Sequence, residues 1–397
     1  MHRVLHIVAS MDPAGGGVAQ AIHTIASGLR VEGFSSEVVS VDNPASAFLN
    51  LDRGLTIHAL GPGRFGWGFS KRLRSWLESE GAGFDCWIVH GLWLYPSYLA
   101  VSIAGRSGLP VHVYPHGMLD PWFQSWRRRP FKTLRNVLYW HLLEAATIRE
   151  ATSLLFTCEE ERRLAATTFH RYRPQAEAVV GLGNADVPRA DSIPSDAFAA
   201  LCPEIAERPY LLFLGRLHPK KGIDLLLEGW AEATRGLPAA SAPLLVIAGP
   251  GEDSDYGRAL RRQAETLLPP GACCFPGMVA GDAKWAALRG AAAFVLFSHQ
   301  ENFGIAVVEA LACETPVLIS NKVNIWREII DRRAGWVASD SAVSVADCLK
   351  VWLKLSTEAR DAARARARTT FLEVFEGGQA SQRLAEHLRG EDNKRAS

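Results

Sequence analysis

The sequence predicts an α/β protein with two Rossmann-like domains. Its 397 residues are enough for two domains, each with its own core. Short apolar runs alternate with amphipathic stretches in both halves, as in parallel sheets covered by helices on both faces. Between the halves, four prolines interrupt a polar stretch from Asn184 to Pro209, which is typical of an interdomain linker.

The elements follow in order along each half. In the first half we expect strands at 4–9, 36–41, 55–59, 86–90, 110–115, 153–157 and 178–180. Helical patterns fill most of the gaps, notably 18–33, 72–80, 132–150 and 159–168. In the second half the expected strands are 210–214, 244–248, 273–275, 294–297 and 316–319. The predicted domains are 1–187 and 210–374, with a linker at 188–209 and a last helix and tail at 375–397.

The most informative segment runs from Ser298 to Ala310, directly after a predicted buried strand. Glu301 stands at the carboxyl end of that strand, where open α/β sheets bind their ligands. Gly304 permits a tight turn into a helix, whose first N–H groups and positive dipole end suit a phosphate. Glu309 follows eight residues after Glu301. Each carboxylate can accept hydrogen bonds from two hydroxyls at once, as a sugar or ribose diol offers.

A second strand–turn–helix segment carries two positive charges. After the apolar run 210–214 come Gly215, Arg216 and, five residues further on, Lys221. Arg216 offers a planar fork of donors and Lys221 a compact point charge, so together they can clamp a diphosphate. The loop precedes the glutamate segment by about 80 residues, with two βα units between. This order and spacing argue against a chance combination of the two segments.

The two segments resemble the E-x7-E and G-R-L-x-x-x-K-G motifs of glycosyltransferase family 4, the retaining GT-B sugar transferases. The resemblance covers nearly the whole chain and is strongest from Leu211 to Val317. This chain has Asn302 and Glu314 where the family usually has glycine, and we expect Glu314 to strain its loop slightly. The resemblance implies two domains that face a cleft and a last helix, here 375–388, that crosses back onto the first domain.

The resemblance also implies roles for individual residues. Arg216 and Lys221 would hold the diphosphate of a nucleotide sugar. Glu301 would hold hydroxyls of the transferred sugar, and Glu309 those of the ribose. The other residues expected at the donor are Gly215, Gly249, Gly251, Asn302, Phe303, Gly304 and Ile305. No covalent nucleophile stands out, so we expect front-face displacement with retention of configuration.

The first domain adds candidates at two strand ends and in one loop. His116 follows the strand at 110–115 and, by the family pattern, lies close to the donor sugar. His90 ends the preceding strand and is an acceptor-side candidate. A triple glycine between the first strand and helix permits close approach of a ligand to the backbone. These acceptor-side glycines are Gly15, Gly16 and Gly17. The alternative roles are a strand-capping histidine and a tight turn without ligand.

Asp253 and Asp255 form a D-x-D pair, which in other transferases holds a divalent metal on the diphosphate. Here the pair follows the glycine turn of Gly249 and Gly251, and we expect both aspartates to cap the next helix. Because the basic loop supplies built-in cations for the leaving group, no metal or other cofactor is expected.

The composition of the chain bears on whether it binds nucleic acid or a membrane and on the state of its cysteines. A net charge of +1 lacks the global basic field of nucleic-acid binders. No apolar run is long enough to span a bilayer, and the N-terminal one is too short for a signal peptide. Seven scattered cysteines without C-x-x-C fit reduced thiols in the cytosol. The segment Trp122 to Lys132 combines aromatic rings with arginines, which fits peripheral membrane docking, a loop packed over the first domain, or a lip of the acceptor pocket.

We therefore expect an enzyme that moves a sugar from a UDP- or GDP-sugar to a glycan acceptor, in surface polysaccharide or lipid-linked oligosaccharide synthesis. One alternative is a Rossmann oxidoreductase that binds NAD. It would need glycine at Gln20 and an acidic residue after the second strand, where Asp42 is a weak match. The other alternative is a non-catalytic nucleotide-sugar-binding subunit. The joint presence of Arg216, Lys221 and the two glutamates opposes it.

Overall fold

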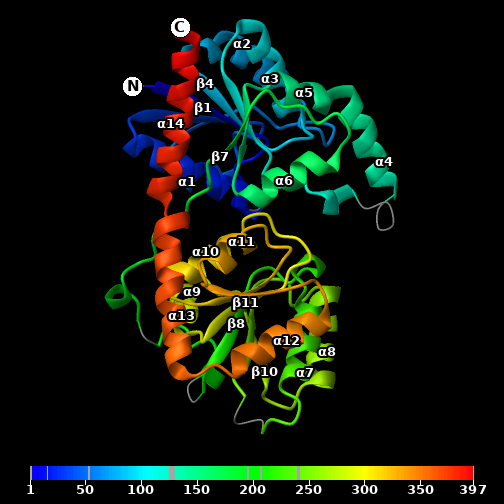
Figure 1. Ribbon diagram of the computed structural model, residues 1–397. Coiled ribbons are helices and arrows are strands. Elements are labelled where there is room, and N and C mark those ends of the chain that lie inside the picture. Colours follow the sequence, from blue (N-terminus) through cyan, green and yellow to red (C-terminus); the bar gives the residue numbers. More distant parts are fainter. Residues whose placement is uncertain are drawn as a thin grey trace. The chain divides into compact units, whose positions relative to one another are not determined.

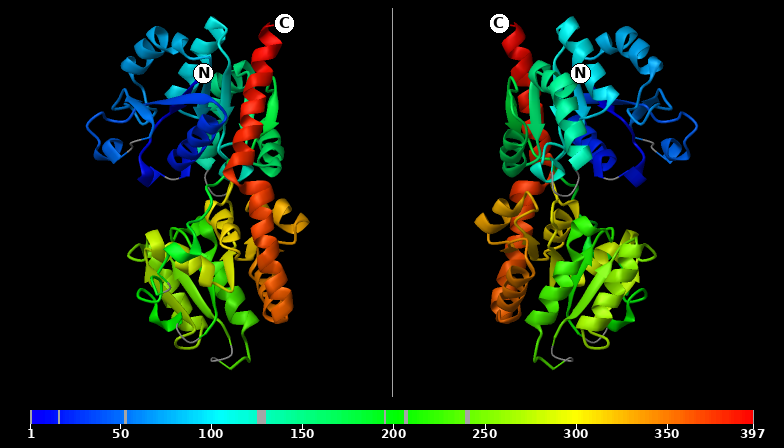
Figure 2. Two further views of the ribbon diagram at one scale, coloured as in Figure 1. Left: turned by 90° about the vertical axis from the view of Figure 1, so that its left-hand side faces the viewer. Right: turned by 90° about the vertical axis from the view of Figure 1, so that its right-hand side faces the viewer.

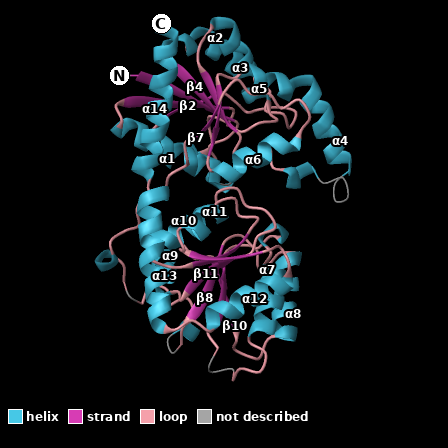
Figure 3. Cartoon of the chain, in the orientation of Figure 1, coloured by secondary structure: helices cyan, strands magenta, loops and turns pink. Residues whose placement is uncertain are grey.

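The computed structural model describes residues 2–15, 17–51, 54–124, 130–194, 196–205, 208–238 and 242–396 (Figure 1). The chain divides into two compact units. The first contains residues 1–183 together with 377–397, and the second contains residues 184–376. Each unit is built on one open sheet of parallel strands flanked by helices, which Figure 3 separates by colour.

The first unit has a seven-stranded sheet in the order β3-β2-β1-β4-β5-β6-β7. Its strands are β1 His2–Val8, β2 Phe34–Ser40, β3 Thr56–Ala59, β4 Cys86–His90, β5 Val111–Tyr114, β6 Ser153–Phe156 and β7 Glu177–Val179. Its α-helices are α1 Gly17–Val31, α2 Lys71–Ser79, α3 Tyr95–Ser107, α4 Pro130–Tyr139, α5 Ala145–Glu150, α6 Glu159–Thr168 and α14 Gly377–Ala396. The central strand β4 is buried along its whole length, as expected for a strand covered on both faces.

The last helix, α14, belongs to the first unit (Figure 2). It packs against α1, where Gly28 leaves room for Ser381: a Cβ at Gly28 would lie only 1.7 Å from Ser381 Oγ. Arg389 Nη2 also donates to the carbonyl of Glu32 at 2.6 Å. The expected return of the last helix to the first domain is therefore confirmed, although the helix begins at Gly377 and runs further than predicted.

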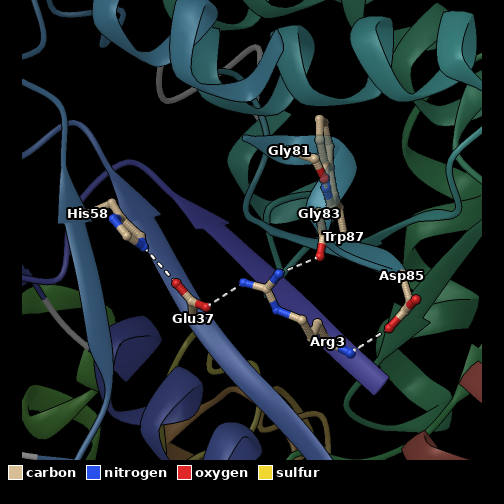
Figure 4. A network of polar contacts seen from close by, with 7 residues as sticks. All are labelled: Arg3, Glu37, His58, Gly81, Gly83, Asp85 and Trp87. Atoms are coloured by element: carbon tan, nitrogen blue, oxygen red, sulfur yellow. Dashed lines mark hydrogen bonds and ion pairs between the residues drawn. The ribbon is translucent and has the colours of Figure 1, made fainter. Parts of the chain in front are cut away.

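A polar network joins the first three strands of the first unit to the loop before β4 (Figure 4). Arg3 donates from Nη2 to Glu37 Oε1 at 2.9 Å and from Nη1 to the carbonyl of Gly83 at 2.7 Å. Glu37 Oε2 also lies 2.8 Å from His58 Nε2. These contacts join β1, β2 and β3 to the loop before β4, and so support the part of the sheet that carries no candidate site residue.

The second unit has a six-stranded parallel sheet in the order β10-β9-β8-β11-β12-β13. Its strands are β8 Tyr210–Leu214, β9 Leu244–Ala248, β10 Cys273–Gly277, β11 Ala293–Leu296, β12 Val317–Ser320 and β13 Gly335–Ala338. Its α-helices are α7 Ile223–Ala233, α8 Asp255–Leu267, α9 Gly281–Gly290, α10 Ile305–Ala312, α11 Trp326–Asp331, α12 Ala342–Leu353 and α13 Thr357–Thr370. The strands β8, β9, β11 and β12 are buried throughout, which explains their unbroken apolar sequences.

Three parts of the structure differ from the sequence-based expectation. Strand β13 was not predicted from the sequence. The expected helix at 132–150 is interrupted by a π-helical turn at Trp140–Glu144. Residues 188–209 do not stand apart as a linker but lie within the second unit, where Phe198 and Cys202 are buried.

Both sheets reverse their strand order once at the centre, between β1 and β4 in the first unit and between β8 and β11 in the second. The loops that leave the two strands at such a point diverge, which opens a crevice at their carboxyl ends. The crevices are therefore expected beside the loops that follow β1, β4, β8 and β11. None of the helices that the structure describes is both apolar enough and long enough for a membrane span.

Candidate active site

The loop after β8 carries the two basic candidates. Arg216 is exposed, and no carboxylate among the described residues pairs with it. Lys221 ends a 3₁₀ turn, Pro219–Lys221, which His218 caps by accepting a hydrogen bond from the Lys220 N–H at 3.1 Å. The next residue, Gly222, has φ of 62°, and a Cβ there would lie 2.1 Å from the Phe297 carbonyl oxygen. Glycine is therefore required for this loop to lie against the loop after β11.

This close approach brings Lys221 to Glu301. The Lys221 Nζ and Glu301 Oε2 atoms form an ion pair, and the two side chains are only 23% and 17% exposed. The Glu301 backbone is held by two further hydrogen bonds, from its N–H to the Lys322 carbonyl at 2.9 Å and from the Asn324 N–H to its carbonyl at 3.0 Å. The structure thus places a cation and a carboxylate, predicted separately, in direct contact at the reversal point of the sheet.

The amino end of α10 lies directly after Glu301. Its N-cap residue is Gly304, with φ of 71°, which has no side chain to accept from the first N–H groups of the helix. Phe303 is buried against Phe375, with 5.8 Å between ring centroids, and this packing holds the turn in place. Asn302 Oδ1 accepts from Asn324 Nδ2 at 3.2 Å. Ile305 begins the helix. The segment therefore presents backbone donors and a positive dipole end next to the ion pair.

Glu309, on α10, is paired with a residue that the sequence did not reveal. Lys284 Nζ donates to Glu309 Oε1 at 2.7 Å, and the same ammonium group lies 3.9 Å from the centroid of the Trp285 ring. Lys284 lies on α9, which precedes the motif by one strand. A single lysine on an amphipathic helix carries no local signal, so only the tertiary structure identifies it as the partner of Glu309.

The glycine turn after β9 holds the basic loop in position. A Cβ at Gly249, whose φ is 140°, would lie 2.0 Å from the Gly215 carbonyl oxygen, and a Cβ at Gly251 would lie 3.0 Å from that of Leu217. The Leu217 N–H also donates to the Pro250 carbonyl at 2.8 Å. These glycines thus let the β9 turn support the loop that carries Arg216.

The predicted capping role of the D-x-D pair was wrong. The side chain that caps α8 is Ser254, which accepts from the Gly257 N–H at 3.0 Å. Asp255 is the first residue of the helix and pairs with Arg258 on the next turn. Serine occupies the cap because the N-cap residue is the one whose backbone is still extended, and Asp255 is already helical.

Glu314 has φ of 60°, the left-handed conformation that favours glycine. The strain expected from a non-glycine residue at this turn is therefore present.

Three side chains that could bind a metal ion, Cys202, Glu204 and Cys274, lie close together elsewhere among the described residues of the second unit. The two sulfur atoms are 2.9 Å apart. Two thiolates on one tetrahedral zinc ion would be roughly 3.7 Å apart, so this group does not have the geometry of a zinc site.

In the first unit the two predicted histidines are in contact. His90 ends β4 and His116 follows β5, and His90 Nδ1 lies 3.0 Å from His116 Nε2. The rings are nearly parallel, with an angle of 17° between their planes. A third histidine, His6 of β1, lies 3.0 Å from His90 and was not predicted, because it occupies a core position of an apolar strand.

The backbone around His116 is unusual. His116 has φ of 50°, and Gly117 donates its N–H to Glu161 Oε1 at 2.6 Å. Glu161 is buried, and its other oxygen accepts from the Thr157 N–H at 2.8 Å. This buried carboxylate holds the turn that presents His116 at the carboxyl edge of the sheet.

The glycine loop after β1 forms a 3₁₀ turn, Pro13–Gly15, and α1 begins at Gly17. Gly16 lies outside the described residues. Next to this loop, the buried Asp42 accepts from Ser10 Oγ at 2.5 Å, from the Met11 N–H at 2.8 Å and from Ser40 Oγ at 2.8 Å. Asp42 therefore holds the end of β1, and its oxygen atoms are already occupied where an NAD-binding protein would need them for a ribose.

Two family models match the chain in succession. A model described as a glycosyl transferase 4-like domain matches residues 16–183, and one described as glycosyl transferases group 1 matches residues 203–370. Among curated relatives, the D-inositol 3-phosphate glycosyltransferase of Frankia alni is 35% identical over 145 residues, which cover 35% of each chain. Glycogen synthase of Mycobacterium tuberculosis is 30% identical over 200 residues, 49% of this chain and 44% of that protein.

The chain thus matches between about a third and a half of the length of these relatives. Among the solved structures that match it along almost its whole length are the following two. The structure of Anabaena HepE in complex with UDP and glucose has a TM-score of 0.75 at 16% identity, covering 98% of this chain and 100% of that one. Sucrose-phosphate synthase from Thermosynechococcus elongatus has a TM-score of 0.74 at 17% identity, covering 99% and 100%. At these identities the likeness shows the fold. Since the fold and the consecutive family models agree over both units, the chain belongs to the family 4-like glycosyltransferases of the GT-B fold.

Proposed function

We propose that this glycosyltransferase transfers a sugar from a nucleoside diphosphate sugar to a glycan acceptor with retention of anomeric configuration. The observation that carries the proposal is the Lys221–Glu301 ion pair beside the uncapped amino end of α10. A donor of this class has two parts, an anionic diphosphate and a polyhydroxyl sugar. The site offers a cationic and an anionic side chain at one point, which matches both parts.

The diphosphate is proposed to bind between the basic loop and α10. Arg216 and Lys221 would face its oxygen atoms, and the first N–H groups of α10 would bind it from the other side. Charge builds up on the diphosphate as the bond to the sugar breaks, and preorganised cations stabilise that charge. Since the chain supplies these cations itself, the reaction is proposed to need no metal ion. The binding of UDP in the structure of Anabaena HepE supports this class of donor.

The ion pair also suggests how the donor is engaged. Lys221 would leave Glu301 when the diphosphate arrives, because a phosphate carries more charge than one carboxylate. Glu301 would then be free to accept hydrogen bonds from hydroxyls of the sugar. Glu309 is proposed to bind the ribose diol, and its contact with Lys284 fixes the carboxylate in one orientation. One carboxylate thus acts on the group transferred and the other on the nucleoside.

For the chemistry we propose front-face displacement. The bond between the anomeric carbon and the diphosphate oxygen breaks, and the acceptor oxygen forms its new bond from the same face. The acceptor hydroxyl proton passes to the departing phosphate oxygen. His116 is proposed to contact the sugar near the reacting carbon, and His90 and the loop of Gly15 and Gly17 to lie on the acceptor side.

The acceptor is proposed to be lipid-linked, with the enzyme at the cytoplasmic face of a membrane. Residues 121–143 contain five Lys and Arg residues and no Asp or Glu. Of the segment Trp122 to Lys132, residues 125–129 lie outside the described residues, but α4 follows directly. Its Phe131, Leu134 and Leu138 are 89%, 58% and 59% exposed at helical spacing. Exposed apolar residues on a basic helix are typical of an interfacial surface.

The proposal is tested by thermal unfolding of the full chain with a panel of UDP- and GDP-sugars, and with NAD as the control for the oxidoreductase alternative. A donor at a hundred times its dissociation constant should stabilise the chain by about 2.7 kcal/mol. Release of free nucleoside diphosphate with the stabilising donor should then distinguish an enzyme from a binding subunit. Stabilisation by NAD alone would contradict the proposal.

A further inference from the structure

Three histidines form a continuous hydrogen-bonded chain across the first unit. His6 lies in β1, His90 ends β4 and His116 follows β5, so the chain crosses three adjacent strands. His6 Nδ1 lies 3.0 Å from His90 Nε2, and His90 Nδ1 lies 3.0 Å from His116 Nε2. Each contact therefore joins Nδ1 of one ring to Nε2 of the next.

The two ends of the chain lead to different surfaces. At one end His6 Nε2 lies 3.3 Å from Ser36 Oγ. Ser36 lines an open surface cavity together with His23 and Arg30. At the other end is Nδ1 of His116, at the carboxyl edge of the sheet, and no hydrogen bond to it comes from the described residues. The buried ring of His90 thus connects a surface cavity with the edge where ligands bind.

The rings in this chain are uncharged near neutral pH. Burial lowers the pKa of His6 to about 3 and that of His116 to about 4. Burial, together with its two histidine neighbours, also lowers the pKa of His90 well below its usual value. A neutral imidazole carries one proton, so one of its nitrogens donates and the other accepts. Each nitrogen contact must therefore contain a single proton.

One proton per ring leaves only two arrangements that satisfy both contacts. If His6 carries its proton on Nδ1, His90 must accept on Nε2 and donate from Nδ1, and His116 must then carry its proton on Nδ1. If His116 carries its proton on Nε2, the same logic puts the protons of His90 and His6 on Nε2, and His6 donates to Ser36. All three rings are thus protonated on Nδ1 or all three on Nε2.

We propose that His6 and His90 are positioning residues that set the tautomer of His116 through this chain. Nδ1 of His116, to which no described residue forms a hydrogen bond, is a donor in one arrangement and a bare acceptor in the other, and no ring becomes charged. When the protons move from the Nε2 arrangement to the Nδ1 arrangement, one proton enters at His116 Nδ1. The Nε2 proton of His116 passes to His90 Nδ1, that of His90 passes to His6 Nδ1, and that of His6 leaves toward Ser36. A sugar hydroxyl both donates and accepts, so it fits either state. Only this choice of ligand rests on the proposed function.

The test is nitrogen-15 NMR of the histidine rings of the full chain at pH 7, without added ligand, since bare and protonated ring nitrogens differ in chemical shift. The inference expects one common ratio of the Nδ1–H to the Nε2–H form for His6, His90 and His116. His6→Leu should change that ratio at His116, and His6→Asn, whose amide can replace the lost Nδ1 contact, should restore it.

His112→Leu is the matched control, because His112 is equally buried in β5 and its ring contacts Ser153 at 2.8 Å. It should leave the His116 ratio unchanged. The inference is overturned if the three wild-type rings carry their protons on different nitrogens, or if His6→Leu leaves the His116 ratio unchanged. The wild-type spectra alone show whether the three rings carry their protons on the same nitrogen, so this part of the test stands even if a variant does not fold. Neither result depends on transferase activity.

Discussion

Lys221 and Glu301 are 80 positions apart in the sequence, and their side chains form a half-buried ion pair at the point where the second sheet reverses its strand order. The pair exists because Gly222 lets the loop after β8 lie against the loop after β11. In the proposed mechanism the two residues contact different parts of one donor. Without a donor they neutralise each other, so neither charge is left unpaired in a partly buried site.

The two glutamates should respond differently to the same substitution. Glu301→Gln should lower the rate more than the donor affinity, because Glu301 contacts the sugar being transferred. Glu309→Gln should weaken donor binding, because the charged acceptor for the ribose diol becomes an amide. Steady-state kinetics with varied donor concentration separates the two effects. If both variants keep the wild-type rate and donor affinity, the two carboxylates are only partners in structural ion pairs with Lys221 and Lys284 and do not bind the donor.

Activity should survive removal of divalent metals. The leaving diphosphate is proposed to be stabilised by Arg216 and Lys221, so transfer in excess EDTA should match that in untreated enzyme. Asp253→Asn and Asp255→Asn should also remain active. A loss of turnover in EDTA that manganese restores would show that a metal ion takes part.

The first unit should bind weakly to anionic vesicles in a salt-dependent manner. Each basic residue near an anionic surface contributes about 1 kcal/mol, so five in one segment should give measurable co-sedimentation at low salt. Replacing Phe131, Leu134 and Leu138 by serine should reduce it, as should replacing Arg127, Arg128 and Arg129. Val343→Ser is the matched control, since Val343 is 74% exposed on α12 of the second unit. Wild-type protein that stays in the supernatant at low salt would exclude membrane docking.

Acidification should destabilise the first unit through its buried histidines. The pKa of His6 is about 3 in the folded chain and that of His116 about 4, against about 6.5 in an unfolded chain. Between these values the unfolded chain binds more protons, so stability is fully present above pH 6.5 and is lost as the pH falls toward 4. The loss is about 1.4 kcal/mol per pH unit for each such group.

The check is urea unfolding of the full chain at pH 7, 6, 5 and 4. His6→Leu should flatten the dependence of the unfolding free energy on pH. His170→Gln, which alters an exposed histidine, should leave it as in the wild type. Equal slopes in all three proteins would mean that His6 does not resist protonation.

The sequence predicted the strands and their carboxyl-end loops well, because parallel strands buried on both faces leave short, unbroken apolar runs bounded by glycine and proline. The predicted loops after β8 and β11 do meet. What could not be predicted is pairing across the tertiary structure. Lys284 and His6 each occupy an ordinary helix or strand position, and only the packing of distant elements places them beside Glu309 and His90. The capping of α8 was misassigned because a serine between two aspartates offers three possible caps.

The most direct test of the account measures by calorimetry how UDP and GDP bind to the wild type, to three site variants and to one control variant, with donor turnover measured in parallel. Arg216→Ala and Lys221→Ala should bind the preferred diphosphate more weakly and lose two to three orders of magnitude in turnover, as the loss of one charge-stabilising group typically causes. Glu301→Gln should bind the diphosphate at least as tightly as the wild type, because Lys221 is then released from its partner. Arg258→Ala, which breaks an exposed pair on α8, is the control. Wild-type diphosphate affinity and turnover in both Arg216→Ala and Lys221→Ala would contradict the account.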